Sequence, residues 1–124
     1  MIKKSDQAIE NHKSGHTCST AVMCAFADDA GINAEQAWKE AMPFAGGKMG
    51  KCGAVLAAEL VLKKKFGEEK AAAKIAELES RFMAMNSSVM CRELKGMGTG
   101  KVLRTCRGCV TDAAVILEDI LEKK

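Results

Sequence analysis

Cysteine is the residue best able to do chemistry in this chain of 124 residues, which contains six of them. Four stand where a helix is expected to begin, because each follows a cap-like or glycine-rich segment: Cys18, Cys52, Cys91 and Cys106. A helix N-terminus offers unpaired N–H groups and the positive end of the helix dipole, and both favour an anionic sulfur. Thiolates attack disulfides and bind metals, so this placement predicts redox or metal chemistry.

The other two cysteines, Cys24 and Cys109, occupy different positions. Cys24 lies about 240° round a helix from Cys18 at 3.6 residues per turn, so we expect it in the apolar core, where free cysteine is common. Cys109 lies one turn after Cys106 and either shares its face or belongs to the core of the last helix. The C-x-x-C spacing alone does not predict a thioredoxin-like protein, because the βαβ context of that motif is missing.

Length and composition restrict the class of protein. A chain of 124 residues fits one domain, here 1–124, which can bury a core without disulfide staples. No run of 18 apolar residues occurs and the first residues turn polar at once, which predicts neither a membrane-spanning helix nor a signal peptide. We therefore expect a cytoplasmic protein, in which cysteines are more often catalytic or metal-binding than structural.

The net charge of +3, from 19 basic and 16 acidic residues, is too small to predict binding to nucleic acid. Several cations nevertheless lie close to the cysteines in sequence: Lys48, Lys51, Arg92, Lys101, Arg104 and Arg107. As a group they would lower thiol pKa values or offset the charge of an anionic cluster. We expect the partner to be another redox protein, with no nucleic acid and no membrane involved, and we keep a homodimer as one option.

An all-α fold is predicted to position these cysteines. The long apolar segments repeat every three or four residues, and none alternates as a strand over a useful length. Helices are expected at about 4–13, 18–30, 34–41, 52–65, 68–85 and 106–121, with a short turn after Cys91 and glycine-rich loops at 44–51 and 96–100. The prediction is a compact single-domain bundle of five to seven helices with a mostly aliphatic core, in which any strand pairing involves only a few residues.

Cys52 is the cysteine for which the sequence predicts the most reactive sulfur. The glycine-rich segment before it, the helix after it and the neighbouring Lys48 and Lys51 should each favour the thiolate. Two further side chains bear on the fold: we expect His16 to be a solvated loop histidine and Trp38 to anchor the core.

Four motifs along the chain carry a resemblance to a known family. They are Cys18-x-x-Ala21-Val22, Gly46-Gly47-x-Met49-Gly50-x-Cys52-Gly53-Ala54-Val55, Cys91-Arg92-Glu93-Leu94 and Cys106-x-x-x-Val110-x-Asp112-Ala113-Ala114-x-Ile116-Leu117. In order and spacing they resemble the C_GCAxxG_C_C family over about residues 14–121, although the closing glycine of its motif is Ala57 here. The resemblance implies a redox-active protein whose functional cysteines are Cys18, Cys52, Cys91 and Cys106. Related domains are attached to a cytochrome of the split-Soret type that carries an iron–sulfur cluster, which implies such a cluster as a candidate cofactor.

Three functions stay open at this point. The first is electron transfer through an iron–sulfur cluster on the four cysteines, since Cys₄ ligation is common for such clusters. The second is metal-free thiol/disulfide chemistry in which Cys52 attacks, with the catalytic roles assigned to Cys52 and Cys106. The third is a structural zinc site in an interaction domain, which ranks last because zinc favours two close C-x-x-C pairs and the chain has one.

Overall fold

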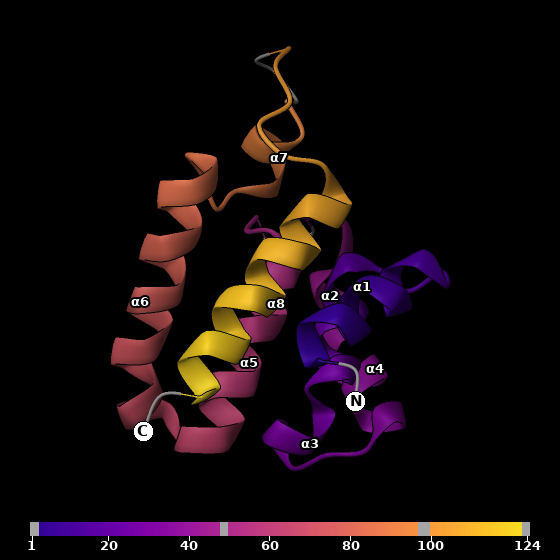
Figure 1. The fold of residues 1–124 in the computed structure, drawn as a ribbon, viewed down its shortest axis with the longest axis vertical. Coiled ribbons are helices and arrows are strands. Elements are labelled where there is room, and N and C mark those ends of the chain that lie inside the picture. The colour runs from indigo at the N-terminus through magenta and orange to yellow at the C-terminus, as the bar shows by residue number, and fades with distance from the viewer. Residues whose placement is uncertain (1–2, 48–49, 97–99, 123–124) are drawn as a thin grey trace.

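The computed structural model describes residues 3–47, 50–96 and 100–122, and the regular secondary structure in these ranges is helical. The α-helices, labelled as in Figure 1, are α1 (Lys4–Lys13), α2 (Cys18–Ala25), α3 (Ala27–Ala30), α4 (Ala34–Ala41), α5 (Gly53–Phe66), α6 (Glu68–Asn86), α7 (Cys91–Leu94) and α8 (Cys106–Glu122). Two of them are single turns of four residues, and the longer ones confirm the predicted all-α bundle. None of the described helices is both long and apolar enough to cross a membrane.

Helix α5 lies at the centre of the bundle. It contacts α2, α3, α6 and α8, and in Figure 1 α8 crosses in front of it, with α6 on one side and α1 to α4 on the other. The sequence suits this position because most residues of α5 as far as Leu62 are apolar and buried. The predicted, mostly aliphatic core is confirmed, and its largest fully buried side chains are Phe26, Phe82, Met23, Leu62, Leu78, Leu94, Ile116, Leu117, Ile120, Val22, Val55 and Val61.

The helix ends follow local sequence signals closely. The Asn33 side chain accepts a hydrogen bond of 2.8 Å from the backbone N–H of Gln36, as a cap for α4 should. Gly31 ends α3 in the left-handed conformation with φ of 74°. One expected helix is different: 18–30 divides at Phe26, whose backbone leaves helical geometry (φ −109°, ψ 19°) while its side chain is fully buried. The boundary between α2 and α3 therefore lies at a residue whose side chain belongs to the core.

The glycine-rich segment predicted as a loop at 44–51 is partly ordered as a helix. A 3₁₀-helix covers Met42–Gly47 and continues directly from α4. Pro43 fits there because proline is tolerated in the first turn of a helix. The α-helix itself ends at Ala41, at the end of the predicted range 34–41. Residues 48–49 of this segment, and 97–99 of the second predicted loop, lie outside the described residues.

A short antiparallel bridge joins two segments on the way to the cysteines. It pairs Lys51 with Met90. The backbone N–H of Cys52 donates to the carbonyl of Val89 at 2.8 Å, and the N–H of Cys91 donates to the carbonyl of Gly50 at 3.1 Å. The bridge agrees with the prediction that strand pairing involves only a few residues, and it brings Cys52 and Cys91 together.

Candidate redox site

Five cysteines line one small cavity at the end of the bundle where α7 lies (Figure 1). Its lining consists of Cys18, Cys52, Cys91, Cys106 and Cys109 together with Leu94, Lys95 and Arg104. The cavity measures about 10 Å³, which is room for about one water molecule. We refer to this feature as the cysteine cavity.

Helix starts bring the four predicted cysteines to the cavity. Cys18, Cys91 and Cys106 are the first residues of α2, α7 and α8, and Cys52 is the N-cap of α5. The start of α2 is held by a capping box in which Thr17 accepts from the backbone N–H of Thr20 at 3.2 Å. The structure therefore brings together the residues that the sequence singles out, while the chemical role of each stays a prediction.

Gly53 allows α2 and α5 to begin in contact. A Cβ atom placed on Gly53 would lie 2.7 Å from the sulfur of Cys18 and 2.7 Å from the carbonyl oxygen of Phe44. Only a residue without a side chain fits this position, which gives a physical reason for glycine directly after Cys52. By contrast, Ala57 is fully buried within α5, so alanine fits where the family motif has its closing glycine.

The cysteine thiols interact in pairs. Cys52 is hydrogen-bonded to Cys109, and Cys106 is hydrogen-bonded to Cys18. The hydrogen bond from Cys109, helped by the backbone N–H groups of Val55 and Ala54, outweighs burial and lowers the pKa of Cys52. The same hydrogen bond, together with burial, raises the pKa of Cys109, so Cys109 is the donor.

The lowered pKa of Cys52 agrees in direction with the sequence prediction, but its cause differs. The ammonium group of Lys51 turns away to the carboxylates of α5 and α6, where it pairs with Glu79 and lies 3.7 Å from Glu59. Lys48 lies outside the described residues. The start of α5 and the neighbouring thiol therefore take the role expected of Lys51 in stabilising the anionic sulfur.

Two cations reach the cavity itself. Lys95 is hydrogen-bonded to Cys91, and although burial alone would lower its pKa, the negative charge of the nearby cysteines in their thiolate form raises it. Burial raises the pKa of Cys91 against the opposing effect of Lys95. The guanidinium of Arg104 lines the cavity and is held by Asp112, with nitrogen–oxygen distances of 3.0 and 3.3 Å.

Sequence reasoning missed Lys95 and left Cys109 undecided. Cys109 is buried, with 3% of its surface exposed, and belongs to the cavity as well as to the core of α8. The one-turn spacing from Cys106 was the available signal for it. The signal for Lys95 was its place four residues after Cys91, on the same face of a helical turn.

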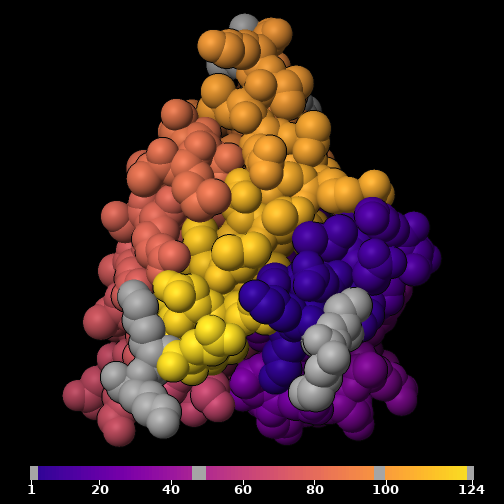
Figure 2. Space-filling model, viewed as in Figure 1, coloured from indigo at the N-terminus to yellow at the C-terminus, as the bar shows by residue number. Residues whose placement is uncertain are grey.

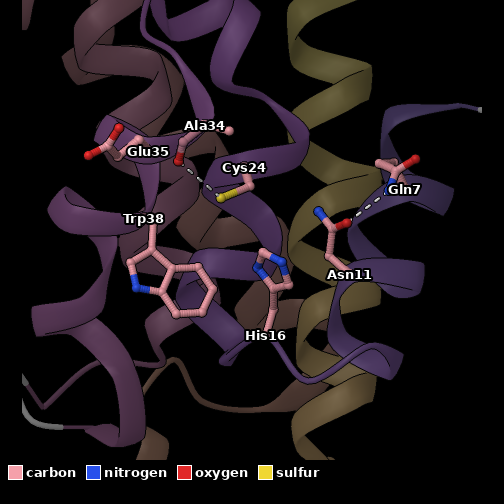
Figure 3. Close-up of a pocket in the computed structure, with 7 residues that line it drawn as sticks. All are labelled: Gln7, Asn11, His16, Cys24, Ala34, Glu35 and Trp38. Carbon is pink, nitrogen blue, oxygen red and sulfur yellow. Dashed lines mark hydrogen bonds between the residues drawn. The ribbon is translucent and has the colours of Figure 1, made fainter.

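Cys24 lies apart from the cavity, as expected, but it is not a core residue. It is half-buried and lines a separate surface pocket with Gln7, Asn11, His16, Ala34, Glu35 and Trp38 (Figure 3). Trp38 is 40% exposed, so its predicted role as a core anchor is wrong. The reason is that α4 packs through the small buried residues Ala37 and Ala41, which leaves Trp38 outside, edge-to-face with His16 at 4.9 Å between ring centres.

The cysteines surround the cavity and do not converge on one point. Among the described residues, no three His, Cys, Asp or Glu side chains are grouped so that they could hold a metal ion. The ligands of an iron–sulfur cluster belong to several iron atoms, so they need not meet at a single ion. The donor type and number at the cavity fit such a cluster, since five thiols are present and four are required.

The fold and the site together define a class: an all-α protein with a buried, thiol-lined centre at converging helix starts. The chain belongs to the family described as "Putative redox-active protein (C_GCAxxG_C_C)", whose family model matches residues 16–120. The comparison with curated proteins and the comparison with solved structures gave no match.

Proposed function

We propose that the cysteine cavity transfers electrons through an iron–sulfur cluster held by Cys18, Cys52, Cys91 and Cys106. The observation that carries the proposal is that four separate helix starts each deliver one cysteine to the same cavity. Membership of a family described as redox-active supports it. When bound, the cluster would supply one-electron chemistry.

The other lining residues suit such a centre. Lys95 and Arg104 would balance the negative charge of thiolate ligands, and the fully buried side chain of Leu94 would exclude water. The cavity of about 10 Å³ is smaller than a cluster, so the thiols must turn away from one another to bind it.

The proposal is tested by the colour and metal content of the protein. After anaerobic incubation with ferrous iron and sulfide followed by desalting, we expect visible absorption with bound iron and acid-labile sulfide. Cys52→Ser should lose all three signals, and the matched control Cys24→Ser should keep them because Cys24 lies in the separate pocket. A colourless, iron-free wild type, or loss in Cys24→Ser with retention in Cys52→Ser, would contradict the proposal.

Thiol/disulfide exchange is the second candidate function. The paired hydrogen bonds between thiols favour it, because they bring sulfur atoms next to one another without any metal. The lowered pKa of Cys52 makes this residue the attacking thiol. A wild type that stays free of iron but is oxidised reversibly by a disulfide reagent would favour this function over the cluster.

The surface beside the cavity fits an acidic redox protein as partner. Residues 90–107 contain five of the 19 basic residues but one of the 16 acidic ones. The described residues of this segment lie at the narrow end of the molecule (orange in Figure 2), and they include the exposed apolar residues Met90, Val102 and Leu103. A basic rim around apolar contacts would attract an acidic carrier and hold it beside the cavity.

Charged small oxidants test this surface. Added salt should slow oxidation of the reduced protein by anionic ferricyanide and speed oxidation by cationic hexaammineruthenium. Lys101→Glu combined with Arg107→Glu should weaken both trends, whereas Lys70→Glu, at the exposed start of α6, should not. Equal salt trends for the two oxidants would contradict an acidic partner. If the wild type is a dimer and the double variant is a monomer, the partner of this surface is a second copy of the chain and not an acidic redox protein.

A further inference from the structure

Cys109 is a fifth thiol in a cavity whose family motif accounts for four. It stands in the first turn of α8, three residues after Cys106, and 3% of its surface is exposed. A cysteine in this position could simply fill the core. Its hydrogen bond to Cys52, however, directs the thiol into the cavity and toward one particular neighbour.

The two cysteines of α8 have different partners. The thiol of Cys106 is hydrogen-bonded to Cys18, and the thiol of Cys109 is hydrogen-bonded to Cys52. Because α5 packs against α8, the contact between Cys52 and Cys109 joins two elements that are already fixed relative to each other. A bond between these two sulfur atoms would therefore link side chains that line the same cavity on two helices already packed together.

We propose that Cys109 closes a disulfide with Cys52 when the cavity holds no cluster, with a low-molecular-weight disulfide as the oxidant. This inference rests on the proposed redox function of the cavity and adds Cys109 to its reacting residues. In the first step the sulfur of Cys52 attacks one sulfur of the oxidant, forms a mixed disulfide and releases one thiolate. In the second step the sulfur of Cys109 attacks the sulfur of Cys52 and releases the second thiolate.

The reaction balances in atoms and electrons. The disulfide bond of the oxidant is broken and the bond between Cys52 and Cys109 is formed, so the protein loses two electrons that the oxidant gains. The protons of the two protein thiols end on the two released small thiols. Cys52 is then blocked as a metal ligand until a reductant opens the bond, so the oxidised cavity cannot take up iron through this residue.

Disulfide mapping of cluster-free protein tests the proposal. Protein shown by metal analysis to contain no iron is incubated with glutathione disulfide, alkylated, digested without reduction and analysed by mass spectrometry. We expect a peptide pair linked through Cys52 and Cys109. In Cys109→Ser we expect Cys52 to accumulate as a mixed disulfide with glutathione, because the second step is blocked. Cys106→Ser, a matched change on the same helix, should still form the Cys52–Cys109 bond.

Each other outcome overturns the proposal. A wild type in which Cys52 remains a thiol, or is linked to Cys106, Cys91 or Cys18, shows that Cys109 does not react with it. If Cys106→Ser keeps native helicity but loses the Cys52–Cys109 bond, then Cys106 is the residue that attacks the mixed disulfide at Cys52. The result for the cluster is separate. An iron-free wild type that forms the Cys52–Cys109 bond would refute the iron–sulfur proposal and support this inference. A protein that binds the cluster but forms no such bond when it is cluster-free would support the iron–sulfur proposal and refute this inference.

Discussion

Helix α2 carries two cysteines whose surroundings differ in every respect that matters for chemistry. Cys18, its first residue, is buried against other thiols in the cysteine cavity. Cys24, near its last turn, is half-buried beside His16 and Trp38 in the surface pocket of Figure 3, with a contact of 3.8 Å from its sulfur to the carbonyl of Ala34. The comparison teaches that position along a helix decides which thiol belongs to the site.

The largest expected contrast between the two regions is in the pH dependence of alkylation. In reduced, cluster-free protein, iodoacetamide should modify Cys52 with a half-maximal rate at lower pH than Cys24. The reason is that the hydrogen bond from Cys109 lowers the pKa of Cys52, while burial raises that of Cys24. Quantitative mass spectrometry of the two peptides gives both profiles. The pH midpoint is the readout, since Cys52 is only 4% exposed and its absolute rate is limited by access. Coincident or reversed midpoints would refute the contrast.

The contact between α2 and α5 at the cysteine cavity should lose more stability from one added methyl group than an exposed position does. Gly53→Ala puts a methyl group 2.7 Å from the sulfur of Cys18, so we expect a loss of about 2 kcal/mol in the free energy of unfolding. Urea denaturation measures it. Ser80→Ala, at an exposed position of α6, is the control: it removes a solvent-facing hydroxyl and raises helix propensity slightly, so the net change should be near zero. Equal effects of the two changes would show that the α2–α5 contact is loose.

Behind the cavity, a buried carboxyl group should make stability fall as pH rises. Burial, then the neighbouring Glu79, raises the pKa of Glu59 to about 8, against the opposing charges of Lys51 and Lys63. The folded state therefore binds this proton more tightly than the unfolded state, where a glutamate has a pKa of about 4.3. The contribution is fully present below the unfolded pKa and is lost as pH rises toward about 8.

Glu79 has the opposite sign. The hydrogen bond from Glu59, and then Lys51, lower its pKa, so its contribution is present at neutral pH and lost as pH falls. Above pH 6 the Glu59 effect should dominate, and between pH 6 and 8.5 the wild type should lose about 2–3 kcal/mol more stability than Glu59→Gln. Urea denaturation at several pH values provides the test, with the exposed Glu69→Gln on α6 as control. Parallel curves for wild type and Glu59→Gln would rule out this role.

The smallest effect on stability is expected in the surface pocket that contains Cys24, His16 and Trp38. Trp38→Leu removes an edge-to-face contact with His16 at an exposed position, so it should cost about 1 kcal/mol or less. Circular dichroism during urea denaturation measures this, and the iron and sulfide content after reconstitution should match the wild type. A loss of more than about 3 kcal/mol would mean that Trp38 carries core packing after all.

The sequence predicts well those features that depend on near neighbours in the chain. The cap at Asn33, the turn at Gly31 and the cysteines at helix starts are of this kind, because their signals lie within a few residues. The same local signals place Cys18, Cys52, Cys91 and Cys106 at helix starts, and these four residues line one cavity because the helix starts meet at one end of the bundle.

Features that depend on distant segments were missed. Lys51 turns to Glu59 and Glu79, which only the packing of α5 and α6 brings within reach. The partner of Cys109 depends on how α8 is rotated against α5, and Trp38 is exposed because α4 uses alanines for its contacts. Neither the rotation of a helix nor its choice between two apolar faces is encoded by spacing alone.

The order in which the cavity residues occur along the chain has a consequence for biosynthesis. Cys18 is synthesised before the other four lining cysteines, whereas Cys106 and Cys109 come last with α8, which also packs against α1. While α8 is still missing or held in the ribosome, the growing chain has at most three of the five lining thiols free to meet. Those three thiols are not yet covered by Cys106 and Cys109 of α8. The cysteine cavity is therefore completed only once α8 has been synthesised and packed, so a chain that stops before α8 lacks the full set of lining thiols.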